Sequence, residues 1–157
     1  MSIRILLAED HELVREALKD TFRGTEIEVV GEAATCPVAV RLATECHVDV
    51  VLVDLKMPGD GGFGVLAQIK AVKQRLPVLI YTVHDHERDI ERGRAMGACG
   101  WLVKGVSKAF LLEAIRLAST GKSLWKTSNV RVAVSTSGCK EIVACRPAKG
   151  CATRAGP

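Results

Sequence analysis

The chain has 157 residues, 48% of them hydrophobic and 25% charged, which is close to the globular average and sufficient for one packed core with a short appendage. Its apolar runs are far shorter than the roughly 20 residues of a membrane span, and no basic-then-apolar leader opens it, so we expect a cytoplasmic protein without a membrane segment. The net charge of +4 is uneven, because residues 1–121 carry 15 Lys and Arg against 17 Asp and Glu, whereas residues 122–157 carry 7 against 1.

Composition changes at the same position as charge. Up to Gly121 the chain is rich in Leu, Val, Ile, Ala and Glu, and beyond it Ser, Thr, Gly, Lys, Arg and Cys dominate. We therefore predict one domain over residues 1–121 and a basic, disordered tail over residues 122–157, with a short alternating strand pattern at residues 130–134.

Strand-like apolar runs alternate with helix-period stretches through residues 1–121. A strand is predicted over residues 3–10, and a helix over residues 12–22 that places Leu13, Val14, Ala17, Leu18 and Phe22 on one face. Four more pairs follow in the same order. The strands are predicted at residues 27–33, 48–54, 77–82 and 99–104, and the helices at 37–46, 63–73, 86–96 and 108–120, with Ser107 as the last N-cap.

Five strands, each followed by a helix, predict an α/β fold. The expected architecture is a doubly wound (βα)5 unit, a flavodoxin-like five-stranded parallel sheet covered by helices on both faces. In open sheets of this kind, sites form beyond the carboxyl ends of the strands. The chemistry of the protein should therefore be carried by the residues that follow the strands.

Three acids, a hydroxyl and a cation are found at those strand ends. Strand one ends in Glu9 and Asp10, strand three in Asp54, strand four in Thr82 and strand five in Lys104. Clustered carboxylates repel one another unless a cation lies among them, and a hard ion with oxygen ligands, Mg²⁺, meets that need. Thr82 and Lys104 add a hydroxyl donor and a positive charge for an anionic ligand.

This set, with VDLKMPGDGG around Asp54, resembles the receiver domain of two-component response regulators. The stretch FLLEAIRLASTGKSLW (residues 110–125) resembles the last receiver helix and linker of NarL/FixJ-type regulators. The resemblance implies that Asp54 accepts a phosphoryl group from a sensor histidine kinase, which makes the protein a signalling switch and not a turnover enzyme. It also implies possible homodimer formation on phosphorylation.

The resemblance assigns a role to each site residue. Glu9, Asp10, Asp54 and the backbone carbonyl of Lys56 would bind Mg²⁺. Thr82 and Lys104 would bind the phosphoryl oxygens. Trp101, three residues before the lysine, takes the place of a Tyr or Phe that moves inward on activation. Gly105 follows Lys104 where many relatives have a proline in a cis peptide, so the sequence predicts a trans bond or a strained one.

Haloacid-dehalogenase-type phosphatases are an alternative of a different class. They also phosphorylate an Asp at a strand end beside Mg²⁺. They need a second acid two residues later, and Lys56 occupies that position here.

The tail leaves two interpretations open. NarL/FixJ-type regulators continue into a helix-turn-helix DNA-binding domain, but the 36 residues after Gly121 contain no recognition-helix pattern. The tail is either a basic arm that contacts nucleic acid or a protein partner, or the product of a truncation or frameshift that replaced the output domain. DNA-binding transcriptional regulation through this region is therefore the alternative function. We interpret all six cysteines as reduced thiols, since no export signal points to an oxidising compartment. The spacing of Cys139, Cys145 and Cys151 lacks the close pairs and histidines of zinc sites, which argues against metal binding there.

Overall fold

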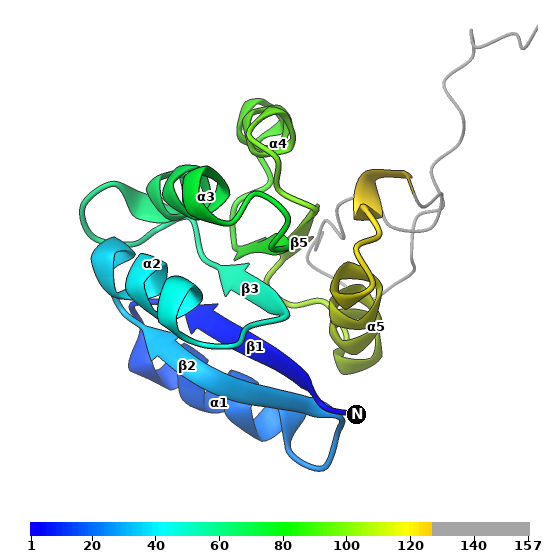
Figure 1. The fold of residues 1–157 in the computed structure, drawn as a ribbon. Coiled ribbons are helices and arrows are strands. Elements are labelled where there is room, and N and C mark those ends of the chain that lie inside the picture. The colour runs from blue at the N-terminus through cyan, green and yellow to red at the C-terminus, as the bar shows by residue number, and fades with distance from the viewer. Residues whose placement is uncertain (127–157) are drawn as a thin grey trace, which may run out of the picture.

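The computed structural model describes residues 1–126. Five β-strands and five α-helices alternate along this range and are followed by a short 3-10 turn, η1 (Figure 1). The predictions made for the tail beyond Lys126, including its three cysteines, lie outside the described residues. The strands are β1 Ile3–Ala8, β2 Ile27–Ala33, β3 Val50–Val53, β4 Val78–Thr82 and β5 Gly100–Val103. The helices are α1 Glu12–Phe22, α2 Cys36–Glu45, α3 Gly61–Val72, α4 Glu87–Ala95 and α5 Lys108–Ser119, and η1 is Leu124–Lys126.

The five strands form one parallel sheet in the order β2-β1-β3-β4-β5, as the predicted fold requires. The chain runs outward from β1 to β2 and then crosses back to β3 on the other side of β1. This reversal of strand order creates a crevice beyond the carboxyl ends of β1 and β3, where ligands bind in open α/β sheets. The two strands that carry the predicted acids are therefore neighbours.

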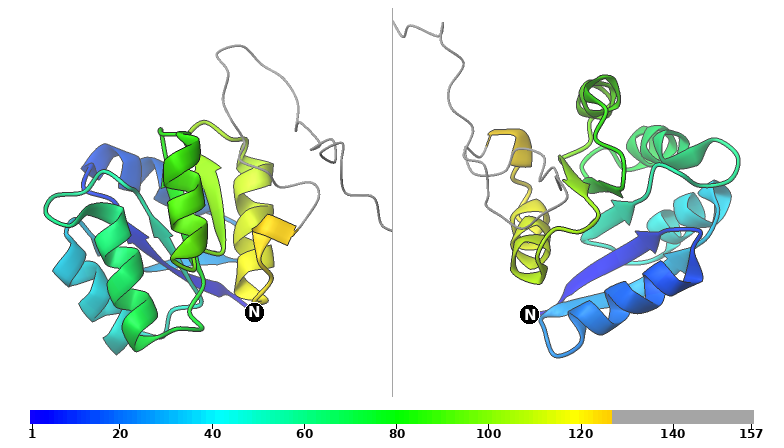
Figure 2. Two further views of the ribbon diagram at one scale, coloured as in Figure 1. Left: turned by 90° about the horizontal axis from the view of Figure 1, so that it is seen from above. Right: turned by 180° about the vertical axis from the view of Figure 1, so that it is seen from behind.

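Successive residues of each strand point to opposite faces of the sheet, and each face has its own helices. Leu6 and Ala8 of β1 pack with α2 and α3, whereas Ile5 and Leu7 pack with α1 and α5 (Figures 1 and 2). Burial on both faces explains why the strands have continuous apolar runs and not strict alternation.

The helix boundaries follow local signals in the sequence. The Ser107 hydroxyl accepts a hydrogen bond from the Phe110 amide at 3.2 Å, which confirms the predicted N-cap of α5. Gly97 and Gly121 follow α4 and α5 with φ of 94° and 76°, a conformation that glycine adopts without strain. Within residues 1–126 no helix is long and apolar enough to cross a membrane.

One prediction for α1 is wrong. Leu18 and Phe22 are buried and Val14 is half-buried, but Leu13 is 84% exposed and Ala17 is also exposed. Residues 14, 18 and 22 face the sheet, whereas residues 13 and 17 are turned away from it around the helix axis.

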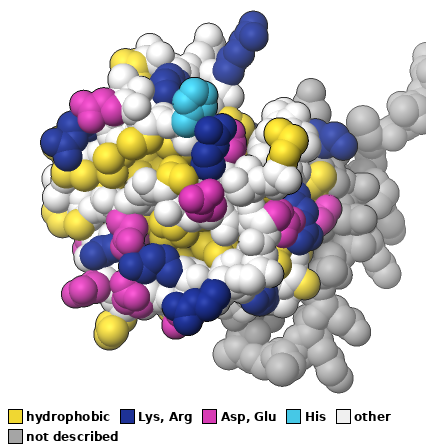
Figure 3. Space-filling view, turned by 60° about the horizontal axis from the view of Figure 1, so that its bottom comes forward, with side chains coloured by type: hydrophobic (Ala, Val, Ile, Leu, Met, Phe, Trp, Pro, Cys, Tyr) yellow, Lys and Arg dark blue, Asp and Glu magenta, His cyan; other side chains and the backbone are white. Residues whose placement is uncertain are grey.

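On the face formed by α1 and β2, positive and negative side chains are interspersed (Figure 3).

We predict that Leu66→Ala in α3 lowers the free energy of unfolding by about 2–5 kcal/mol, because Leu66 is fully buried and its removal leaves a cavity. Urea denaturation of the purified protein measures the change. Leu13→Ala is the matched control and should change the free energy by less than about 0.5 kcal/mol. Similar losses in both variants would contradict the packing described above.

Candidate functional site

Glu9 and Asp54 are the first residues after β1 and β3. Ala8 and Val53 pair in the parallel register, and the Asp54 amide donates to the Ala8 carbonyl at 2.9 Å. The two carboxylates are therefore brought side by side at the crevice. They are nearly inaccessible, with 3% of Glu9 and 5% of Asp54 exposed. Buried carboxylates need charged or hydrogen-bonding partners, since desolvation strongly disfavours an unpaired charge.

Lys104, the residue after β5, supplies the main partner. Its Nζ lies 2.5 Å from Glu9 Oε2 and 2.9 Å from Asp54 Oδ2, so one ammonium group bridges both acids. Desolvation alone would lower the pKa of Lys104, but the hydrogen bonds to Glu9 and Asp54 outweigh it and raise the pKa above its ordinary value. Lys104 therefore remains cationic at neutral pH beside Asp54.

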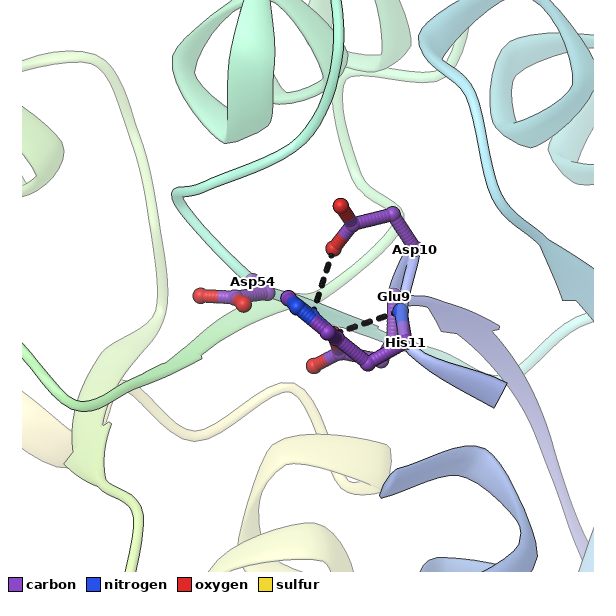
Figure 4. Close-up of side chains that lie close together, drawn as sticks. All are labelled: Glu9, Asp10, His11 and Asp54. Carbon is purple, nitrogen blue, oxygen red and sulfur yellow. Dashed lines mark hydrogen bonds and ion pairs between the residues drawn. The ribbon is translucent and has the colours of Figure 1, made fainter. Parts of the chain in front are cut away.

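Asp10 and His11 complete a compact group with the two buried acids (Figure 4). Nδ1 of His11 lies 3.0 Å from Glu9 Oε1 and 3.0 Å from Asp10 Oδ1. The hydrogen bond to Glu9, followed by the charge of Asp10, raises the pKa of His11. The sequence interpretation missed His11, although its position directly after the acidic pair was the available signal.

The donor atoms of this group fit a hard divalent cation. One ligand atom from each of Glu9, Asp10, His11 and Asp54 lies within 4.8 Å of the others. Asp10 Oδ1 is buried, and its one charged neighbour is His11 Nδ1 at 3.0 Å, with no hydrogen bond of good geometry within the described residues. A buried oxygen without a hydrogen bond, beside two further carboxylates, is consistent with the predicted Mg²⁺ site.

The loop between β3 and α3 keeps Asp54 in place through close backbone contacts. The Lys56 amide donates to Asp54 Oδ1 at 3.3 Å, and the Gly62 amide donates to the Leu55 carbonyl at 2.9 Å. A Cβ atom added at Gly62 would lie 2.3 Å from the Asp54 carbonyl oxygen. Only glycine therefore allows the start of α3 to approach the backbone of Asp54.

Thr82 and Trp101 lie on the β4 and β5 side of the site. Thr82 is fully buried, and its hydroxyl accepts a hydrogen bond from the His84 amide at 3.4 Å. Trp101 is 2% exposed, and its indole Nε1 donates to the His84 carbonyl at 3.1 Å. In this structure Trp101 is therefore already directed inward and bound to the loop that follows β4. The Lys104–Gly105 bond is trans, since the described residues contain no cis peptide.

Sequence comparison agrees with this geometry. Residues 5–116 match the response regulator receiver domain. The chain belongs to the response regulator receiver family. The match is to a signalling domain and gives no support to the haloacid-dehalogenase alternative. The crevice described above is thus the acidic pocket of a receiver domain.

Individual relatives are similar to this chain over its receiver region. The transcriptional regulatory protein YdfI of Bacillus subtilis is 35% identical over 122 residues, which cover 77% of this chain and 57% of YdfI. The nitrate/nitrite response regulator NarL of Escherichia coli is 32% identical over 119 residues, 75% of this chain and 55% of NarL. The chain therefore spans little more than half the length of these relatives.

A solved structure has the same fold. The crystal structure of a LuxR-family two-component response regulator from Aurantimonas is 32% identical and has a TM-score of 0.74, covering 78% of this chain and 89% of that chain. These matches confirm both the receiver fold and the resemblance to NarL-type regulators.

We predict that Gly62→Ala displaces the Asp54 backbone, lowers the free energy of unfolding by about 1–3 kcal/mol and weakens Mg²⁺ binding. Urea denaturation and isothermal titration with MgCl₂ measure the two effects. Gly24→Ala is the control, because an added methyl group at Gly24 meets nothing within 4 Å. It carries only the conformational cost of a positive φ and should leave Mg²⁺ affinity unchanged. Unchanged Mg²⁺ affinity in Gly62→Ala would contradict the proposed dependence on this contact.

Proposed function

We propose that the protein is a phosphoacceptor switch of a two-component system, in which Asp54 takes a phosphoryl group from a sensor histidine kinase in the presence of Mg²⁺. The observation that supports this most strongly is the buried pair of Glu9 and Asp54 bridged by Lys104, beside a buried Asp10 oxygen that forms no hydrogen bond within the described residues. A nucleophilic carboxylate, ligand oxygens for a cation and a fixed ammonium group are the parts that phosphoryl transfer to an acid requires.

Each residue would have a defined part in the transfer. An Asp54 oxygen attacks phosphorus, the P–N bond of the phosphohistidine breaks, and its electron pair remains on the imidazole of the kinase. Glu9, Asp10, Asp54 and the backbone carbonyl of Lys56 would hold Mg²⁺, which would supply positive charge to neutralise the incoming phosphoryl group. Lys104, already 2.9 Å from Asp54, pairs with a phosphoryl oxygen, and the Thr82 hydroxyl donates to another.

Activation would act through the segment after β4. The Thr82 hydroxyl accepts a hydrogen bond from the His84 amide, and the His84 carbonyl accepts one from the Trp101 indole. Rotation of the Thr82 hydroxyl toward the phosphoryl group would break the first of these hydrogen bonds. The Trp101 side chain would then shift from its inward position, and the face formed by α4, β5 and α5 would change shape. Such a protein acts as a cytoplasmic signalling switch and not through turnover, and homodimer formation on phosphorylation is part of the same proposal.

The direct test is labelling with a small phosphodonor. With acetyl phosphate and Mg²⁺, the wild-type protein should gain the mass of one phosphoryl group, which is lost in Asp54→Asn because the nucleophile is gone. Asp10→Asn should lower the labelling rate by at least about tenfold, since one charged metal ligand is removed. Intact-mass spectrometry follows the reaction.

Asp20→Asn on α1 is the control, because Asp20 is exposed and, among residues 1–126, its carboxylate pairs with Arg23 alone. Its labelling should equal that of the wild type. Labelling of Asp54→Asn at the wild-type rate would refute the assignment of the phosphoacceptor.

Transcriptional regulation is a second candidate function. YdfI is named as a transcriptional regulatory protein, and the family match ends at residue 116, before the basic residues 122–157. We propose that any DNA binding by this chain resides in that basic region, which carries 7 Lys and Arg against 1 acid.

A gel-shift comparison tests this candidate. If the basic region binds DNA, the full chain should retard a DNA fragment more strongly at low salt than residues 1–121 do, and the affinity should fall steeply as salt rises. Equal mobility of DNA with both proteins would exclude a DNA-binding role for the region.

A further inference from the structure

The imidazole of His11 is directed at the acidic pair and not at the helix that it begins. His11 is the N-cap of α1, yet its side chain forms no cap hydrogen bond. Helices are usually capped at this position by Ser, Thr, Asp or Asn. The ring lies against the acids, with Nδ1 3.0 Å from Glu9 Oε1 and 3.0 Å from Asp10 Oδ1 (Figure 4). Helix capping therefore does not account for the position of this imidazole.

The backbone around His11 holds the residue at the pocket. Its amide donates to Glu9 Oε1 at 3.1 Å, and its carbonyl accepts hydrogen bonds from the Val14 and Arg15 amides, both at 3.2 Å. Arg15 Nη1 donates to the Glu9 carbonyl at 2.8 Å, which joins the first turn of α1 to the end of β1. A side chain on a segment fixed in this way is placed before any ligand arrives, so binding costs less ordering.

The spacing of the donor atoms matches that of ligands around one small cation. With metal–ligand bonds of about 2.1 Å, two ligands at right angles lie about 3.0 Å apart. Both distances from His11 Nδ1 have this value. Lys104 pairs with the other oxygen of Glu9, Oε2, which leaves Oε1 on the side of the imidazole. A cation at this place would replace the proton that Nδ1 shares with the two oxygens, and that proton would pass to solvent.

A nitrogen ligand changes which cations a pocket prefers. Carboxylates, carbonyls and water suit Mg²⁺, whereas imidazole suits the later transition metals such as Ni²⁺ and Zn²⁺. The pocket combines the carboxylates of Glu9, Asp10 and Asp54 with one imidazole, and one ligand atom from each lies within 4.8 Å of the others. The donor set is therefore mixed, and its nitrogen favours a borderline divalent cation.

The other histidines have different surroundings. The chain has four histidines, all within residues 1–126. His47 is exposed, and the rings of His84 and His86 stack on each other with their centroids 5.9 Å apart. In the part of the chain that the structure describes, the acidic pocket is the one place where a histidine joins carboxylates in a group able to hold a metal ion. His47 and His86 therefore provide matched controls.

We propose that His11 is a metal ligand through Nδ1, so that the pocket binds a borderline divalent transition-metal cation, of the class of Ni²⁺ and Zn²⁺, in competition with Mg²⁺. This inference rests on the proposed function, because it takes the acidic pocket to be the cation site of the phosphoacceptor. It adds a residue that determines which cation the site prefers. The ion beside Asp54 would then depend on the relative concentrations of Mg²⁺ and transition-metal ions.

Isothermal titration of the untagged full chain with NiCl₂ and with MgCl₂ tests the assignment. His11→Gln should lower the Ni²⁺ affinity at least about tenfold, because a nitrogen ligand is lost. The same variant should change the Mg²⁺ affinity by less than about threefold, since Mg²⁺ prefers oxygen ligands. In the wild type, excess MgCl₂ should suppress the binding of Ni²⁺ that His11→Gln loses.

The controls separate ligation from other effects. His47→Gln and His86→Gln should bind Ni²⁺ as the wild type does, and loss of Ni²⁺ binding in His86→Gln in place of His11→Gln would move the site to the stacked pair. Equal Ni²⁺ affinity in the wild type and His11→Gln overturns the proposal. So does an equal change in the Ni²⁺ and Mg²⁺ affinities, because His11 would then act through its charge alone. A wild-type chain that binds Ni²⁺ through His11 but no Mg²⁺ overturns the Mg²⁺ site of the proposed function and not the nitrogen ligand.

A spectrum of the Co²⁺-loaded protein detects the metal–nitrogen bond directly. The unpaired electrons of Co²⁺ shift the NMR resonances of a coordinated imidazole far outside their ordinary range. With isotope-labelled histidine, the wild type and His47→Gln should show one such shifted ring, and His11→Gln should not. A shifted ring that persists in His11→Gln would assign the nitrogen ligand to another histidine and overturn the proposal.

Discussion

The ammonium group of Lys104 between Glu9 and Asp54 is the interaction on which the site depends. Two carboxylates that are almost wholly buried would repel each other and lose their hydration, and removing one partner of such a group is strongly destabilising. Lys104 reaches both from the end of β5, across the end of β4. One side chain thereby joins the ends of β1, β3 and β5 and fixes the nucleophile beside its counter-charge.

The strands that carry the acids are buried more completely than α4. β1 and β3 lie inside the sheet, with helices packed on both faces. By contrast, α4 is a polar helix whose one fully buried residue is Gly93, beside Trp101. Partly buried Ile90 packs against the core, and Arg92 makes a cation–π contact with Phe63. Segments with few buried apolar contacts have low local stability, so α4 is suited to move while the acidic pocket stays fixed.

The sequence predicted the sheet and the pocket because both follow from short-range patterns. Continuous apolar runs mark strands buried on two faces, and the residues after those runs, such as Asp54 and Lys104, must meet at one edge. Leu13 was misassigned because hydrophobic spacing alone does not say where the buried stripe of a helix ends. The partners of His11 and Trp101 depend on side-chain direction and on a loop carbonyl, which periodicity does not encode.

The contacts of Leu124 and Trp125 show that the packed structure extends beyond the point at which the amino-acid composition changes. Average composition changes after Gly121, since the following residues are basic and polar. Leu124 and Trp125 nevertheless contact β5 and the α4–β5 turn, because one buried amide, one indole N–H and one glycine are enough to hold them. A contact built from so few groups is weaker than the core, in which whole helix faces pack against the sheet. Packing therefore continues past the position at which the composition changes, although it does so through a few specific groups.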